Sequence, residues 1–179
     1  MVLLVTGCAR AGSSSGTKGA GGGTAPAALP PGAVTYAVQQ PFELNGLKWM
    51  VSSSEQLTEI KSPSGSASSA KPKNGAWLAA TLYFRGSEGI PGGFDTAMLK
   101  LRGADGQVYD VVETGGAADD YGSTHKNLKN VSSIKLGNAK PQNVYAVFDV
   151  PSSGGPYSLD WMDAKSGAPV VVVTVPLGK

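Results

Sequence analysis

The sequence has few residues that could crosslink the chain or carry acid–base chemistry. It contains one cysteine, Cys8, and one histidine, His125. A single cysteine excludes an intrachain disulfide, and a single histidine excludes a metal site built from several histidines. A Ser-His-Asp arrangement would depend on His125 alone, and no Gly-x-Ser-x-Gly motif accompanies it. The fold must therefore be held together by its hydrophobic core.

Charged residues and long apolar runs are also scarce. Only 16% of the 179 residues are charged, and the formal net charge is +2. Nucleic-acid-binding domains carry clustered basic residues, so we expect no nucleic-acid partner. The sequence has no run of 18 or more apolar residues, which excludes a bilayer-spanning helix within it.

The N-terminal residues resemble a bacterial lipid-modification site. Cys8 ends the tetrapeptide Val5-Thr6-Gly7-Cys8, which has the small residues of a lipobox, and Met1 to Leu4 look like the end of an apolar signal core. A complete signal peptide needs a basic segment and about 7–15 apolar residues. We interpret residues 1–8 as a truncated signal peptide with Cys8 as the lipidation site. The expected location is the extracytoplasmic face of the cell membrane; the alternative is an incidental thiol.

Residues 9–33 form a linker in this interpretation. They contain no aromatic and no acidic residue and are rich in Gly, Ser, Ala and Pro. Such a segment buries too little apolar surface to offset the entropy of ordering it, so we expect a disordered tether with a reach of about 25–30 Å. The folded domain is then expected over residues 34–179.

From Val34 onward the hydrophobic pattern has the period of two that is typical of strands with one buried face. One segment, 77–84, is apolar on both faces and indicates a central strand. Only Ser52 to Ile60 offers a helical turn. The pattern predicts an all-β, antiparallel β-sandwich of about seven to nine strands. The other expected strands include residues 34–38, 47–51, 98–101, 108–112, 134–136, 144–150, 157–161 and 170–175.

The large aromatic residues of these strands are the expected core. Trp77, Tyr83, Phe84, Phe148 and Trp161 each offer a large area to bury. Strand spacing accounts for them without a cofactor-stacking role, and we expect no cofactor.

Several strands, taken in order, resemble a known family. They are the apolar strand 77–84, the strand before the Asp105-Gly106 turn and Tyr109, and the strand that ends in Phe148-Asp149-Val150-Pro151. This order is similar to the immunoglobulin-like, telokin-like domain of unknown function found in bacterial surface lipoproteins, and to secreted immunogenic antigens of mycobacteria. The resemblance covers residues 44–176.

The resemblance implies an immunoglobulin-like sandwich exported behind a lipobox and a low-complexity linker. It implies no catalytic residues, because the family has no agreed ones. Two departures stand out. Arg85 to Glu88 replace the Asn-Gly-rich turn that usually follows the central strand, and Gly115 to Lys126 is longer than the family pattern.

The candidate binding site is the long connection from Glu113 to Asn130, since long loops in compact domains often bind partners. It contains Asp119, Asp120, Tyr121 and His125. Adjacent carboxylates on a Gly-rich loop suit a hard cation such as Ca²⁺, but their spacing does not match an EF-hand. Solvated turn residues are the default interpretation, and we expect no metal site.

Three functions remain open from the sequence. The first is a non-catalytic, lipid-anchored binding module at the cell envelope, with an envelope protein or glycan as partner. The second is a structural or stress-related envelope domain without a dedicated ligand. The third is a hydrolase that uses His125 or a pair of carboxylates.

Overall fold

The protein is described here by a computed structural model, which covers residues 31–63, 70–113 and 115–175. Within these residues ten strands form two sheets. The first sheet contains β1 (Val34–Tyr36), β5 (Leu99–Gly103), β6 (Val108–Asp110), β9 (Tyr157–Met162) and β10 (Pro169–Val175). The second contains β2 (Phe42–Leu44), β3 (Leu47–Leu57), β4 (Gly75–Arg85), β7 (Lys129–Asn130) and β8 (Gln142–Pro151). The connections carry η1 (Thr96–Met98), α1 (Ala117–Thr124) and η2 (Val131–Ser133).

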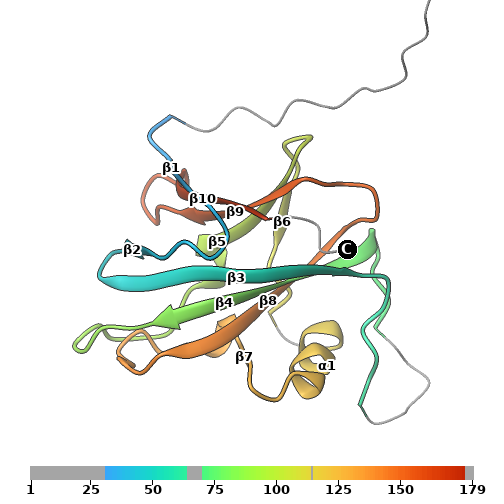
Figure 1. Ribbon diagram of the computed structural model, residues 1–179, viewed down its shortest axis with the longest axis horizontal. Coiled ribbons are helices and arrows are strands. Elements are labelled where there is room, and N and C mark those ends of the chain that lie inside the picture. The colour runs from blue at the N-terminus through green and yellow to red at the C-terminus, as the bar shows by residue number, and fades with distance from the viewer. Residues whose placement is uncertain (1–30, 64–69, 114, 176–179) are drawn as a thin grey trace, which may run out of the picture.

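The two sheets pack face to face (Figure 1), which confirms the all-β sandwich. Their strand orders are β1-β10-β9-β5-β6 and β2-β3-β4-β8-β7. Most pairs are antiparallel, but β1 pairs with β10 and β7 pairs with β8 in parallel. The described residues thus have more strands than the seven to nine predicted, because β2 and β7 are short edge strands that the sequence analysis did not detect.

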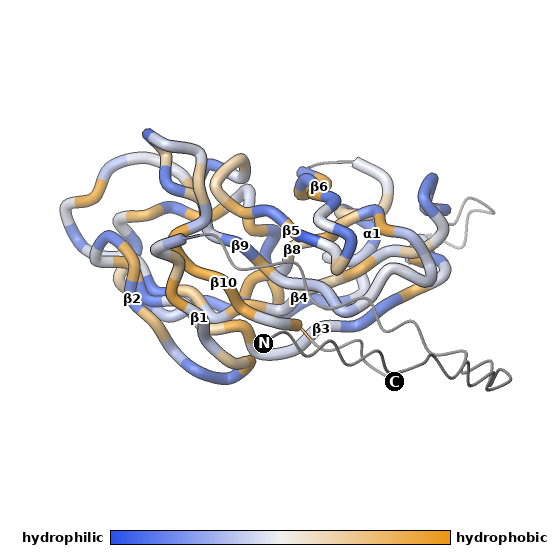
Figure 2. Tube along the Cα trace, turned by 90° about the horizontal axis from the view of Figure 1, so that it is seen from above, coloured by the Kyte–Doolittle hydropathy of each residue, from blue (hydrophilic) through white to orange (hydrophobic). Residues whose placement is uncertain are grey.

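The main core lies between the sheets and follows the period-two pattern. Phe84, Phe148 and Trp161 are each at most 1% exposed, as predicted. Figure 2 shows β10 as an almost continuous hydrophobic stretch, as its run of valines requires. Trp49 is buried to the same extent and joins this core. Burial of these side chains is the dominant favourable contribution to folding.

A second apolar cluster covers the outer face of the second sheet. Trp77 belongs to this cluster, packed with Tyr121 and Tyr145, and its Nε1 donates a hydrogen bond to the Ala70 carbonyl at 2.9 Å. The central strand, β4, is apolar on both faces because its outer face packs against α1. Tyr83 also points to the outer face but is only half-buried, so the prediction that it fills the core is wrong.

Helix α1 approaches β8 closely. The Tyr145 hydroxyl donates a hydrogen bond to the Ala118 carbonyl at 2.9 Å. A Cβ atom at Gly122 would clash with the Tyr145 hydroxyl, so glycine is required inside this helix despite its low helix propensity. The sequence analysis predicted no helix in this region, and the helix exists because tertiary contact stabilises a segment that is too short to be helical alone.

Two local predictions are corrected by the structure. Residues 52–57 belong to β3 rather than to a helical turn, because their backbone pairs with β4 as far as Leu57. Residues 134–136 form no strand. Lys135 makes only an isolated bridge to Gly93, and the preceding residues are the short helix η2.

Cys8 and residues 9–30 lie outside the described residues, so the structure does not bear on the lipidation site or on most of the linker. Among the described residues, no helix has the length and hydrophobicity needed to cross a membrane.

The buried phenol of Tyr157 gives a prediction for alkaline pH. Burial, followed by the charges of Tyr109 and Asp105, raises the pKa of Tyr157 to about 12, above the ordinary value of 10.0. Between these two pH values the unfolded chain loses this proton and the folded chain keeps it, so the free energy of unfolding falls as pH rises. Urea unfolding at pH 9, 10, 11 and 12 measures this fall. It should be shallower in Tyr157→Phe, and an equal slope in both proteins would contradict the prediction.

Candidate functional site

The connection that the sequence predicted as a binding loop is largely the helix α1. Asp119 and Asp120 lie in its first turn, and Asp119 Oδ2 accepts a hydrogen bond from the Gly115 amide at 3.0 Å. Carboxylates at this end of a helix are stabilised by its dipole. The structure thus corrects the loop assignment and gives both acids a helix-stabilising position.

Tyr121 and His125 lie together one turn further along the helix. Their rings stack with centroids 4.0 Å apart, and Tyr121 is only 3% exposed. The Tyr121 hydroxyl donates to Glu55 Oε1 at 2.7 Å, and His125 Nε2 lies 4.0 Å from the same oxygen. Burial, followed by the bond to Glu55, raises the pKa of Tyr121 above its ordinary range. Tyr121 is thus a core residue, which leaves Asp119, Asp120 and His125 as the accessible members of the predicted set.

Glu55 is a residue that the sequence analysis missed. It lies on β3, 66 residues before Tyr121, and only the strand pairing brings it to α1. A carboxylate near an imidazole, as Glu55 is near His125, orients the ring. The hydroxyl next to this imidazole, that of Thr124, is already used in another hydrogen bond. The Thr124 hydroxyl donates to the Tyr121 carbonyl at 2.9 Å and lies 3.0 Å from His125 Nδ1. In the described part of the chain, no group of three or more His, Cys, Asp or Glu side chains could hold a metal ion.

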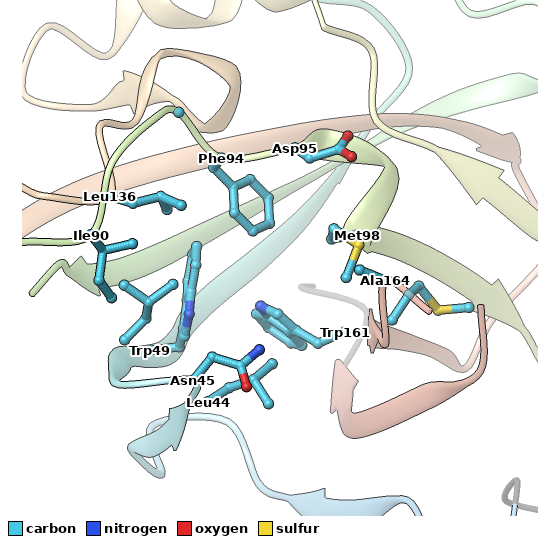
Figure 3. Close-up of a pocket in the computed structure, with 13 residues that line it drawn as sticks. Leu44, Asn45, Trp49, Ile90, Phe94, Asp95, Met98, Leu136, Trp161 and Ala164 are labelled. Atoms are coloured by element: carbon cyan, nitrogen blue, oxygen red, sulfur yellow. The ribbon is translucent and has the colours of Figure 1, made fainter. Parts of the chain in front are cut away.

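A different feature lies at the opposite end of the second sheet from α1 (Figure 1). Here a partly open pocket of about 280 Å³ is lined mainly by apolar side chains (Figure 3). Six of them are Leu44, Trp49, Ile90, Phe94, Leu136 and Trp161. The lining residues come from the β2–β3 hairpin, the connections after β4 and before β8, the last residue of η1, and the end of β9 with the turn that follows it.

The outer wall of the pocket is fixed by backbone hydrogen bonds between two connections. The Ser87 amide donates to the Leu136 carbonyl at 3.0 Å, and the Leu136 amide donates to the Gly92 carbonyl at 3.0 Å. The Phe94 amide donates to the Ile134 carbonyl at 3.1 Å. These bonds hold Leu136 and Phe94 in place without a strand, so the wall is built by segments that have no regular pattern in the sequence.

The opposite wall is the β2–β3 hairpin. Leu44 pairs with Leu47, and the two residues between them, Asn45 and Gly46, have φ values of 53° and 76°. Positive φ at both central positions is the type I′ geometry that favours Asn-Gly. This tight turn places Leu44 and Asn45 at the mouth of the pocket (Figure 3).

The floor of the pocket is aromatic. Trp49 is 5.0 Å from Phe94 and 5.9 Å from Trp161, measured between ring centroids. Trp49 and Trp161 are almost fully buried, whereas Phe94 is partly exposed. The indole Nε1 of Trp161 is buried without a hydrogen-bond partner, and the ring packs against the aromatic rings of Trp49 and Phe42.

One carboxylate lies on the rim. Asp95 precedes η1, and its Oδ1 accepts a hydrogen bond from the Ala97 amide at 2.9 Å. This cap fixes the side chain above Met98 (Figure 3). The thirteen residues that line the pocket include no Lys, Arg or His, and Asp95 is the only charged one.

The sequence analysis did not find this pocket. Two signals were present: the Asn45-Gly46 dipeptide, which indicates a hairpin, and the apolar residues Ile90 and Phe94 inside a connection otherwise rich in Pro and Gly. Neither signal shows that these segments meet, because they are separated along the chain and join only in the folded sandwich.

No protein-family model matches this sequence, and no curated protein sequence matches it either. Among solved structures, the chain is similar to MPT63, a secreted protein from Mycobacterium tuberculosis, with a TM-score of 0.52 and 14% sequence identity. The match covers 79% of this chain and 97% of that one. At this identity the likeness shows a shared fold, in agreement with the expected similarity to secreted mycobacterial antigens.

Proposed function

We propose that this protein is a non-catalytic binding module on the extracytoplasmic side of the cell envelope, held to the membrane by a lipid on Cys8. The proposed binding site is the pocket at the end of the sandwich, and its ligand is a small apolar molecule. The observation that carries the proposal is the partly open pocket of about 280 Å³, lined by residues of the main core and by side chains packed against it.

The size and lining of the pocket support ligand binding. An apolar cavity of about 150 Å³ holds one benzene molecule, and typical ligand sites measure about 300–1,000 Å³. The pocket lies near the lower end of that range. Apolar side chains that face an empty space lose dispersion contacts, which costs stability. The partly exposed apolar residues of the lining, among them Ile90, Phe94 and Leu136, are the ones that would gain contacts when a ligand binds.

Export and anchoring rest on separate support. The lipobox-like Val5-Thr6-Gly7-Cys8, the linker composition and the fold shared with a secreted protein all favour display outside the cytoplasm. The resemblance to the telokin-like, immunoglobulin-like domain of surface lipoproteins favours the same conclusion. The absence of an agreed catalytic residue in that family, together with the engaged Thr124 beside His125, favours a non-catalytic role.

The exposed side of α1 is a second candidate contact surface. It presents Asp119 and His125 on a helix that is held rigidly against the sheet by Tyr121. An envelope protein or glycan that binds there would leave the pocket free, because the two sites lie at opposite ends of the second sheet (Figure 1). A structural envelope domain without a ligand remains the alternative to both.

The pocket is tested by ligand titration with a blocking variant. Apolar probes of about ten non-hydrogen atoms, such as 4-phenyl-2-butanone, should change the fluorescence of the buried Trp49 and Trp161 and saturate. Ala164→Phe places a ring at the pocket mouth and should weaken binding by about tenfold or more, roughly 1.4 kcal/mol. Ala168→Phe, in the same turn but outside the pocket, is the matched control. Equal binding by both variants would locate the probe elsewhere.

The anchor is tested in the native host. We expect mass spectrometry of the mature protein to show a diacylglyceryl adduct on an N-terminal Cys8. In Cys8→Ala the protein should leave the membrane fraction almost completely, because no other membrane attachment is proposed. A mature protein with an intact Met1 would overturn the anchor and leave the pocket proposal untouched.

A further inference from the structure

The end pocket has a one-sided charge distribution. Asp95 is the only charged residue among the thirteen that line it. Outside the lining, the adjoining β9–β10 turn carries Asp163 and Lys165, and Lys135 makes a bridge to the lining residue Gly93. Hydrogen bonds, first from the backbone of Ser166, hold the pKa of Asp163 below its usual value.

An anionic ligand would find no compensation in this pocket. A carboxylate that leaves water needs donors or a positive charge, and the lining offers no Lys, Arg or His. Asp95, the only acidic residue among the thirteen, would repel it. Fatty acids and other apolar anions are therefore disfavoured.

A cationic ligand, in contrast, is favoured by this lining. The faces of aromatic rings attract positive charge when it lies within about 6 Å of the ring centroid. Phe94, which is partly exposed, provides such a ring in the pocket, and the almost fully buried Trp49 lies behind it with the two ring centroids 5.0 Å apart. The polarizable sulfur atoms of Met98 and Met162 complete the lining beside them.

We infer that the pocket selects small organic cations with an apolar body, such as an alkylated ammonium attached to an aromatic or short alkyl group. The apolar body packs against the partly exposed Ile90, Phe94 and Leu136, and the positive charge lies on the Asp95 side of the mouth. This inference rests on the proposed function, because it names the ligand class of the same pocket.

Asp95 offers a clean variant for testing this inference. Its side chain has two roles, the charge on the rim and the hydrogen bond to the Ala97 amide. Asparagine is as good a cap as aspartate and has the same shape, so Asp95→Asn removes the charge and retains the cap. Asp110→Asn, on an exposed carboxylate of β6 away from the pocket, is the control for charge removal elsewhere.

The experiment compares three probes of equal size by calorimetric titration: benzyltrimethylammonium, the neutral 4-phenyl-2-butanone, and 3-phenylpropanoate. For the wild-type protein and for Asp110→Asn, we expect the cation to bind about three- to thirtyfold tighter than the neutral probe. The carboxylate should bind more weakly than both. In Asp95→Asn the ratio of cation affinity to neutral-probe affinity should fall at least about threefold.

Two different failures can be told apart. If the neutral probe binds and Ala164→Phe blocks it, the pocket is a ligand site. In that case the inference of a cationic ligand fails if 3-phenylpropanoate binds as tightly as the cation. It also fails if Asp95→Asn keeps the full cation preference. If none of the three probes binds at millimolar concentration, the pocket itself fails as a ligand site, and the proposed function fails with it. Salt gives a further check, because the cation preference should shrink as ionic strength rises.

Discussion

Arg102→Met should lower the free energy of unfolding by about 3–5 kcal/mol, which is a large fraction of the stability of a domain of this size. Arg102 binds the Asp160 carboxylate in two places, with Nε to Oδ2 at 2.6 Å and Nη2 to Oδ1 at 3.2 Å. The Asp160 side chain is only 3% exposed. Without the guanidinium, a buried carboxylate remains, and among the described residues its one side-chain donor is the Ser158 hydroxyl. Urea unfolding at pH 7 measures the loss.

A matched control is available on the same strand. Lys100 lies two residues from Arg102 and pairs with Asp110, whose side chain is 80% exposed. Such surface pairs contribute about 0–1 kcal/mol, so Lys100→Met should change stability little. In the double variant Arg102→Met/Asp160→Leu, most of the loss should be recovered because the unpaired charge is gone. Equal losses in Arg102→Met and Lys100→Met would refute the buried-pair explanation.

Phe148→Ala should cost about 3–5 kcal/mol by a different mechanism. Phe148 is fully buried in β8 between the sheets, and its strand partner on β4 is Leu78. Truncation removes the transfer free energy of the ring and leaves a cavity that a sandwich with two hydrogen-bonded sheets cannot close. Thermal and urea unfolding should both show the loss.

The control for Phe148→Ala is an exposed apolar residue. Val108 is 55% exposed at the start of β6, so Val108→Ala should change the free energy of unfolding by less than about 0.5 kcal/mol. A loss at Val108 comparable to that at Phe148 would mean that the β6 edge is covered in solution.

Much of the fold could be predicted because period-two hydrophobicity is a local signal. The alternation at Leu47, Trp49 and Val51 and the valine run of β10 each indicate a strand without reference to the rest of the chain. The double-sided apolar pattern of residues 77–84 also showed correctly that this strand is covered on both faces. What covers its outer face, α1, was not predicted.

Helix α1 was missed because its local signals conflict. Gly115, Gly116 and Gly122 argue against a helix, whereas Ala117, Ala118 and the acids of the first turn favour one. Contact with Tyr145 decides in favour of the helix. Gly122 is needed for the close approach of the helix to Tyr145, and Tyr121 is buried when the helix packs there. Because the predicted loop is a helix, the predicted site also differs from the expectation. The structure brings Tyr121 and His125 together beside Glu55, and it places Asp119 and Asp120 at the start of the helix.

The pocket is the feature that lay furthest beyond the sequence. Asn45, Phe94 and Trp161 are separated by tens of residues, and no spacing rule relates them. Composition and local periodicity by themselves indicated an all-β sandwich without an intrachain disulfide, and the motif Val5-Thr6-Gly7-Cys8 resembles a lipobox. The tertiary structure alone decided which side chains meet at the end of the sandwich and that one carboxylate, Asp95, lies among them. Hydrophobic patterning specifies which face of a strand is buried and not how the connections between strands pack.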